Sequence, residues 1–127
     1  MTREEHRGEP RVPLKLKVAI VYHQHQDEET RPTYHGVTND ISMFGLSVVV
    51  DYNIFNAGEV TVLLAIPPEH VGGPQCVIEA TAKMVYTVHS SEHHAFRIGM
   101  LFKGFKKDGE ELLRYTLARR SFKYEYQ

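Results

Sequence analysis

The stretch Leu14-Lys-Leu-Lys-Val-Ala-Ile-Val-Tyr22 begins with alternating apolar and polar residues. Successive side chains of a β-strand point to opposite faces, so this alternation predicts a strand with one buried face. The polar run 23–32 follows and predicts a long, solvated hairpin loop. The first regular element of the chain is therefore expected to be half of a β-hairpin.

Five further strands are predicted along the chain. The segment Gly45–Val50 is rich in β-branched residues, and Glu59–Ile66 is closed by Pro67 and Pro68. The predicted strands after the first are 33–40, 45–50, 59–66, 76–88 and 95–102. Short strands separated by turn signals favour a mainly β fold, a small six-stranded antiparallel β-barrel, which also removes exposed sheet edges.

The C-terminal part of the chain changes to helical periodicity. Asp108 has the form of an N-cap, with the acidic Glu111 three residues later, and leucines follow at helical spacing. We predict a helix over 108–120 whose Leu113 and Leu117 cover one opening of the barrel. The chain is then a single domain over 1–127, with a flexible ligand-binding arm at 1–13 and the barrel at 14–103.

The composition limits the classes of function. The chain has 127 residues, 42% of them hydrophobic, with 15 Lys and Arg against 16 Asp and Glu. This balance does not favour a broad surface for duplex nucleic acid, and no apolar stretch is long enough to span a membrane. The single Cys76 cannot form an intrachain disulfide and is expected to be a buried apolar side chain. We therefore expect a cytoplasmic protein.

Two short segments carry the chemistry of an anion- and guanine-binding site. Arg7 and Arg11 offer two planar guanidinium groups, which match phosphate oxygens or the O6 and N7 edge of guanine. Asp40 can accept hydrogen bonds from the Watson–Crick edge of guanine, and Ser42 can donate one to a phosphate oxygen. Gly45 is expected to serve a tight turn or a close backbone approach.

These residues resemble the PilZ domain family, whose pattern is an R-x-x-x-R arm followed by a [D/N]-x-S-x-x-G motif. Arg7 and Arg11 match the first motif, and Asp40, Ser42 and Gly45 match the second. The segment 96–102, the strand pattern and the closing helix are also similar to this family. The resemblance implies a barrel that binds cyclic di-GMP, a bacterial cytoplasmic second messenger, and so a receptor rather than an enzyme, with no cofactor.

One position departs from the pattern of many PilZ domains. They carry a further Arg immediately before the first motif Arg, where this chain has His6, and Arg3 is the nearest extra cation. His6, Arg3 and Gly99 are secondary site candidates, although Gly99 is expected to serve backbone geometry. One ligand or an intercalated pair per site, the oligomeric state and the downstream protein partner stay open. Control of motility, exopolysaccharide synthesis or surface attachment is implied only at the level of the family.

Two alternatives belong to other functional classes. Asp40 and Ser42 could organise a turn through hydrogen bonds to the backbone, which would leave a ligand-independent interaction adaptor. The histidines could bind a metal, with His23 and His25 facing one ion and His93 and His94 in another polar stretch. Because no recognised zinc spacing is present, we predict solvated loop histidines and no metal site. Without a G-x-S-x-G motif, we also assign no catalytic residue.

Overall fold

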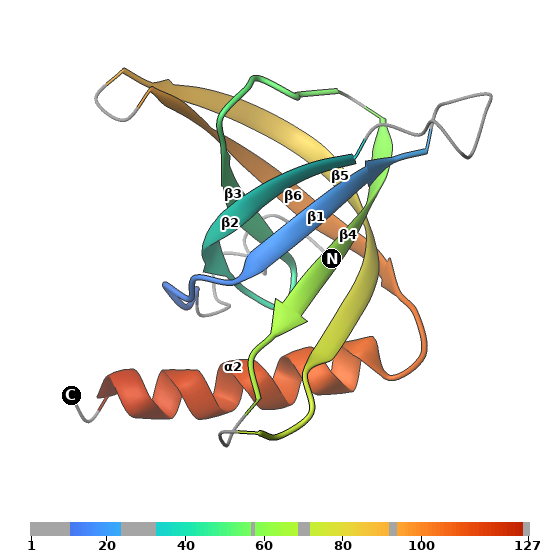
Figure 1. The fold of residues 1–127 in the computed structure, drawn as a ribbon, viewed down its shortest axis with the longest axis vertical. Helices are drawn as coiled ribbons and strands as arrows, with labels where there is room; N and C mark the ends of the chain where they lie inside the picture. Colours follow the sequence, from blue (N-terminus) through green and yellow to red (C-terminus); the bar gives the residue numbers. More distant parts are fainter. Residues whose placement is uncertain (1–10, 24–32, 57, 69–71, 92–93, 126–127) are drawn as a thin grey trace.

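The computed structural model describes residues 11–23, 33–56, 58–68, 72–91 and 94–125, with side chains as far as Arg119. Six antiparallel strands close into a barrel in the order β1-β2-β3-β6-β5-β4, and one helix follows (Figure 1). The predicted fold class, a six-stranded antiparallel β-barrel with a C-terminal helix, is confirmed. The elements are β1 (Lys17–Tyr22), β2 (Thr33–Ile41), β3 (Gly45–Val50), β4 (Glu59–Ile66), β5 (Cys76–Ser90), β6 (Ala95–Phe105) and α2 (Gly109–Glu125).

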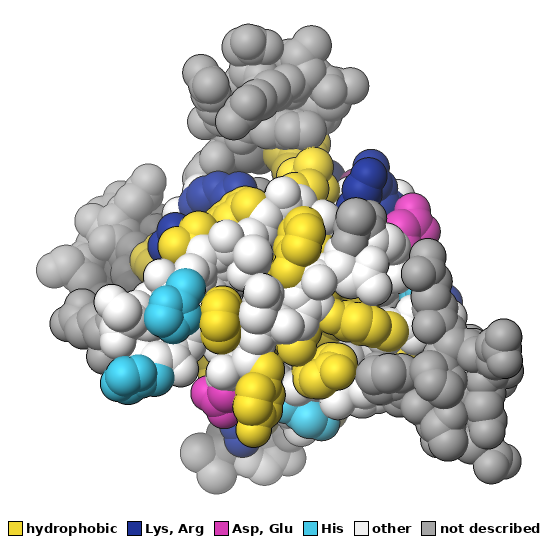
Figure 2. All heavy atoms as spheres, turned by 90° about the horizontal axis from the view of Figure 1, so that it is seen from above, with side chains coloured by type: hydrophobic (Ala, Val, Ile, Leu, Met, Phe, Trp, Pro, Cys, Tyr) yellow, Lys and Arg dark blue, Asp and Glu magenta, His cyan; other side chains and the backbone are white. Residues whose placement is uncertain are grey.

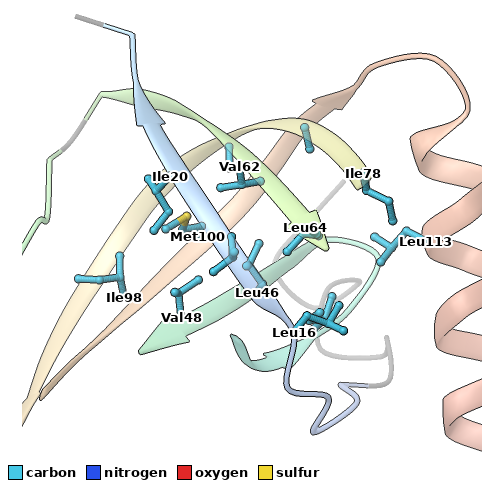
Figure 3. Packing of buried hydrophobic residues seen from close by; sticks show 14 of the residues in the cluster. Leu16, Ile20, Leu46, Val48, Val62, Leu64, Ile78, Ile98, Met100 and Leu113 are labelled. Atoms are coloured by element: carbon cyan, nitrogen blue, oxygen red, sulfur yellow. The ribbon is translucent and has the colours of Figure 1, made fainter. Parts of the chain in front are cut away.

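The core fills the inside of the barrel. In β4 every second side chain, from Val60 to Ile66, is buried, as the two-residue period of a strand requires. Side chains from β1, β3, β4, β5 and β6 meet in the interior (Figure 3). β1 begins at Lys17 rather than at the predicted Leu14, but Leu14 and Leu16 remain in the core at 6% and 2% exposure. The alternation therefore located the buried face correctly and the strand start incorrectly.

Strands β5 and β6 are longer than predicted and form a hairpin that extends away from α2 (Figure 1). β5 continues to Ser90, which pairs with Ala95, and β6 continues to Phe105, which pairs with Ala80, so each strand contains residues that the sequence analysis placed in flanking loops. Two register shifts interrupt this pairing, and both add a residue to one strand relative to the other. The prediction for Cys76 was wrong, because this residue at the start of β5 is exposed.

Helix α2 closes one end of the barrel. Leu113 is fully buried and points toward Ile78 of β5, and Leu117 is 7% exposed, so the predicted capping face is confirmed (Figure 3). The helix continues to Glu125, beyond the predicted end at Arg120. Within the described residues, no helix is both long and apolar enough to cross a membrane.

The end of the molecule opposite α2 has a mixed surface. Figure 2, seen from above relative to Figure 1, shows hydrophobic side chains in separate small groups between histidines and uncharged atoms. On the described part of this face, Lys and Arg do not gather into one block. This distribution agrees with the near-neutral composition and gives no support for a duplex nucleic-acid surface.

Candidate functional site

The last residues of the predicted arm are anchored to the barrel. Val12 pairs with Ile41 of β2 through two backbone hydrogen bonds, with N···O distances of 2.8 and 3.0 Å. The Val12 side chain is only 3% exposed and belongs to the core. Since neighbouring side chains in extended chain point to opposite faces, an inward Val12 places Arg11 on the outer surface. The anchor thus fixes Arg11 beside the end of β2.

The structure brings Arg11 and Asp40 of the two motifs together. Nη1 of Arg11 lies 2.8 Å from Oδ1 of Asp40, in both hydrogen-bonding and ion-pair geometry. The two side chains are 55% and 27% exposed, respectively. An exposed ion pair contributes about 0–1 kcal/mol to stability, so a ligand can replace it at little cost. The ion pair positions the guanidinium and carboxylate groups, and both can still exchange this contact for one with a ligand.

A β-bulge in β2 decides where Asp40 points. Thr38 pairs with Val48 and faces the core, and Asp40 would share that face in a regular strand. The register shift between Thr38 and Asp40 inserts one residue, so Asp40 pairs with Ser47 on the outer face. Bulges commonly redirect side chains in this way beside functional sites. The carboxylate consequently reaches Arg11 at the surface.

Ser42 builds the turn between β2 and β3. Its Oγ accepts hydrogen bonds from the backbone N–H groups of Phe44 and Gly45, at 3.1 and 3.3 Å, and donates to the carbonyl of Gly45 at 3.4 Å. The residue is 3% exposed. One hydroxyl has one hydrogen and two lone pairs, so these contacts use its full capacity. Contact between this hydroxyl and a phosphate would require the turn to rearrange.

Gly45 is required by a close backbone approach, as the sequence analysis expected. A Cβ atom at this position would lie 2.1 Å from the carbonyl oxygen of Met100 in β6. Gly45 pairs with Leu101 in the same ladder. Because the atom in the way belongs to a paired backbone, no side-chain rotation could relieve the clash. Gly45 therefore allows β3 and β6 to pair directly after the Ser42 turn.

Four residues that pair across four adjacent strands form a row next to the ion pair. Asp40 of β2 pairs with Ser47 of β3, Ser47 pairs with Gly99 of β6, and Gly99 pairs with Tyr86 of β5. We call these four residues the cross-strand row. The Tyr86 ring lies over Gly99, where an added Cβ would come within 1.9 Å of Cε1. Gly99 thus makes room for a ring, rather than serving only its own backbone as predicted.

Sequence reasoning missed Ser47 and Tyr86. Neither residue belongs to the two motifs, and both join the site only through strand pairing that is shifted by bulges. A weak signal was available in the β-branched segment 45–50, where Ser47 is the only polar residue. No comparable signal marks Tyr86. Its partner Gly99 becomes apparent only once the register is known.

Several predicted residues lie outside the described part of the chain. Arg3, His6 and Arg7 of the arm are among them, as are His25 and His93 of the metal alternative. Nε2 of His23, directly after β1, lies 2.6 Å from Oγ1 of Thr61 in β4, in a hydrogen bond. Among the residues that the structure describes, no three His, Cys, Asp or Glu side chains are grouped to hold a metal ion.

Comparison with known proteins identifies the family. The profile of the PilZ domain matches residues 2–118, which is most of the chain. The chain therefore belongs to the PilZ domain family. No curated protein sequence matches it significantly.

Solved structures share the fold. Bacillus subtilis MotI/DgrA, described as an inhibitor of motility, has a TM-score of 0.71 at 20% identity over 97% of this chain and 53% of its own. K. pneumonia MrkH, solved as a cyclic di-GMP complex, has a TM-score of 0.67 at 15% identity, covering 98% of this chain and 54% of its own. The chain thus spans about half the length of both proteins. The PilZ domain of Escherichia coli YcgR, solved with cyclic di-GMP, has a TM-score of 0.51 at 11% identity, covering 94% and 97% of the two chains.

Proposed function

We propose that this chain is a non-enzymatic receptor for cyclic di-GMP in the bacterial cytoplasm. The ligand binds on the outer surface of the barrel, at Arg11, Asp40 and the turn that Ser42 and Gly45 hold in place. The arm, with Arg7 as its second guanidinium, closes over the nucleotide and alters a surface that a downstream protein recognises. The receptor needs no cofactor, because binding and closure are its whole activity.

The observation that carries this proposal is the Arg11–Asp40 ion pair. The two residues are far apart in sequence, in two different motifs, and their side chains meet at 2.8 Å on an exposed surface. A guanidinium group can bind the phosphate or the Hoogsteen edge of guanine, and a carboxylate can accept from its Watson–Crick edge. Both groups are therefore available where one nucleotide could engage them together.

The anchored Val12 limits how the arm can move. Its two backbone hydrogen bonds to Ile41 and its buried side chain tie the chain to the barrel directly after Arg11. We propose that closure on ligand binding occurs before Val12, so that Arg11 stays near Asp40 while the preceding segment covers the nucleotide. In this proposal Arg11 is a fixed part of the site, and Arg7, with Arg3 and His6 as further candidates, forms the mobile part.

Isothermal titration with cyclic di-GMP, with GTP as the control nucleotide, tests the proposal. We expect saturable binding to the parent protein and none to GTP, with a molar ratio that distinguishes one ligand from an intercalated pair. Arg11→Ala should lower the affinity about tenfold to a hundredfold, because it removes charge-assisted hydrogen bonds. Its unfolding free energy should change by less than about 1 kcal/mol, as for other exposed pairs.

The matched control is Arg114→Ala on α2. Arg114 is also exposed and paired, with Nη2 3.6 Å from Oε1 of Glu110, but it lies on the helix that closes the barrel. We expect this variant to bind like the parent. No binding by the folded parent, or equal binding by the parent and Arg11→Ala, would contradict the proposed site.

A ligand-independent interaction adaptor is the second candidate. Two observations favour it: Ser42 already uses its hydrogen-bonding capacity in the turn, and a groove of about 670 Å³ lies elsewhere on the barrel surface. Its mainly apolar lining includes Val37 and Val77, which are 41% and 58% exposed. An adaptor would bind its partner equally well with and without cyclic di-GMP, whereas the receptor's affinity for its partner would depend on the nucleotide.

A further inference from the structure

Ser47 has a buried hydroxyl group on the outer side of the barrel wall. Its neighbours Leu46 and Val48 point into the core, so the Ser47 side chain points the other way. The residue is nevertheless only 1% exposed. Within the described structure, its Oγ is a buried side-chain polar atom with no hydrogen-bond partner.

An unpaired buried hydroxyl is costly and calls for an explanation. Leaving such a group without a partner costs about 1–3 kcal/mol, and native proteins tolerate few of them. Alanine would fit the same position without this cost, because it lacks only the hydroxyl. A residue that lowers stability in this way is expected where the hydroxyl finds its partner in another state of the protein.

The surroundings of Ser47 indicate what that partner is. In the cross-strand row, Ser47 pairs directly with Asp40, whose carboxylate is bound to Arg11. On its other side it pairs with Gly99, over which the Tyr86 ring lies. Tyr86 is 39% exposed, so its ring can turn toward solvent without disturbing the core. The hydroxyl is thus between the charged pair and a movable aromatic side chain.

We propose that Ser47 is a ligand-contacting residue, whose hydroxyl donates a hydrogen bond to the nucleotide bound at Arg11 and Asp40. The inference rests on the proposed receptor function and extends its site from β2 onto β3. Binding turns the Tyr86 ring away from Gly99, and an acceptor oxygen or nitrogen of the nucleotide then accepts a hydrogen bond from the Ser47 hydroxyl. The acceptor-rich edges and phosphates of cyclic di-GMP suit a single hydroxyl donor.

The test exploits opposite effects on stability and affinity. Ser47→Ala should keep or raise the melting temperature of the ligand-free protein, because it removes an unpaired buried hydroxyl. The same variant should bind cyclic di-GMP about three- to tenfold more weakly in isothermal titration, the loss expected for one neutral hydrogen bond. A purely structural serine would not show this combination.

Thr38→Val is the matched control. Thr38 also has a buried hydroxyl, but its Oγ1 donates to the carbonyl of Leu14 at 2.6 Å and accepts from the N–H of Leu16 at 2.8 Å. Its replacement should lower the melting temperature and leave the affinity of the remaining folded protein unchanged. The two variants should therefore shift stability in opposite directions or, at least, by clearly different amounts.

A fluorescent reporter at position 86 tests the movement of this ring independently of the stability and affinity measurements. The chain contains no Trp, so Tyr86→Trp gives a single tryptophan in the cross-strand row. Its emission should change as cyclic di-GMP is added and stay constant with GTP.

Each outcome bears on the inference. Three results would overturn it while leaving the receptor function intact: Ser47→Ala binding as tightly as the parent, a lowered melting temperature of that variant, or constant tryptophan emission from a Tyr86→Trp reporter that binds the nucleotide. Failure of the folded parent to bind cyclic di-GMP would instead overturn the receptor function, and this inference with it.

Discussion

The inner and outer faces of the β2–β3 pair differ in whether a buried hydroxyl group has a hydrogen-bond partner. On the inner face Thr38 is fully buried, and its hydroxyl both donates and accepts a hydrogen bond. On the outer face, at the next pair along the ladder, Ser47 is equally buried and its hydroxyl has no partner among the described residues. The buried hydroxyl on the inner face is thus paired, whereas the outer face keeps a buried polar group that stability alone does not explain.

The largest expected effect comes from disrupting the pairing that both faces share. Gly45→Val places a side chain 2.1 Å from the Met100 carbonyl oxygen, so β3 and β6 must separate locally. We expect a loss of about 3 kcal/mol or more in the free energy of unfolding, measured by urea denaturation. Gly104→Ala in β6 is the control, because nothing lies within 4 Å of an added Cβ there. Equal denaturation midpoints for the two variants would contradict the close approach.

A smaller effect is expected from a change confined to the outer face. Gly99→Ala brings a Cβ against the Tyr86 ring, but a ring that is 39% exposed can rotate away. The cost should therefore stay below about 1 kcal/mol, well under that at Gly45. A double-mutant cycle with Tyr86→Ala isolates the contact, and the cost of Gly99→Ala should disappear in the Tyr86→Ala background. A cost that persists there would assign Gly99 to backbone geometry instead.

The same contrast between faces explains how far the sequence could predict the structure. The inner face follows from alternation, so strand positions, the capping Leu113 and the barrel could be predicted. The outer face depends on register, which the shift between Thr38 and Asp40 changes by a residue. Motif spacing identified Arg11 and Asp40, and the structure brings them together. Motif spacing could not identify Ser47, because a bulge has no reliable signature in a single sequence.

The smallest expected effect concerns the hydroxyl of Tyr22, a residue that is less buried than Thr38 and Ser47. Tyr22 is partly buried, and its hydroxyl donates to the carbonyl of Ile54. Burial, with a smaller contribution from neighbouring Tyr34, raises the pKa of Tyr22 above its usual value. The folded state thus favours the neutral phenol, and this stabilisation is present below the unfolded pKa of about 10.

The stabilisation that comes from the neutral Tyr22 phenol is lost as the pH rises through the higher pKa of this group in the folded protein. Tyr22→Phe should therefore have a lower melting temperature than the parent at neutral pH, because it lacks the hydrogen bond to Ile54. The difference should shrink as the pH is raised above about 10, since only the parent has this phenol to ionise. Melting curves of both proteins from neutral to alkaline pH measure this difference directly. A difference that stays constant across the series would show that the Tyr22 phenol is solvated as freely in the folded chain as in the unfolded one.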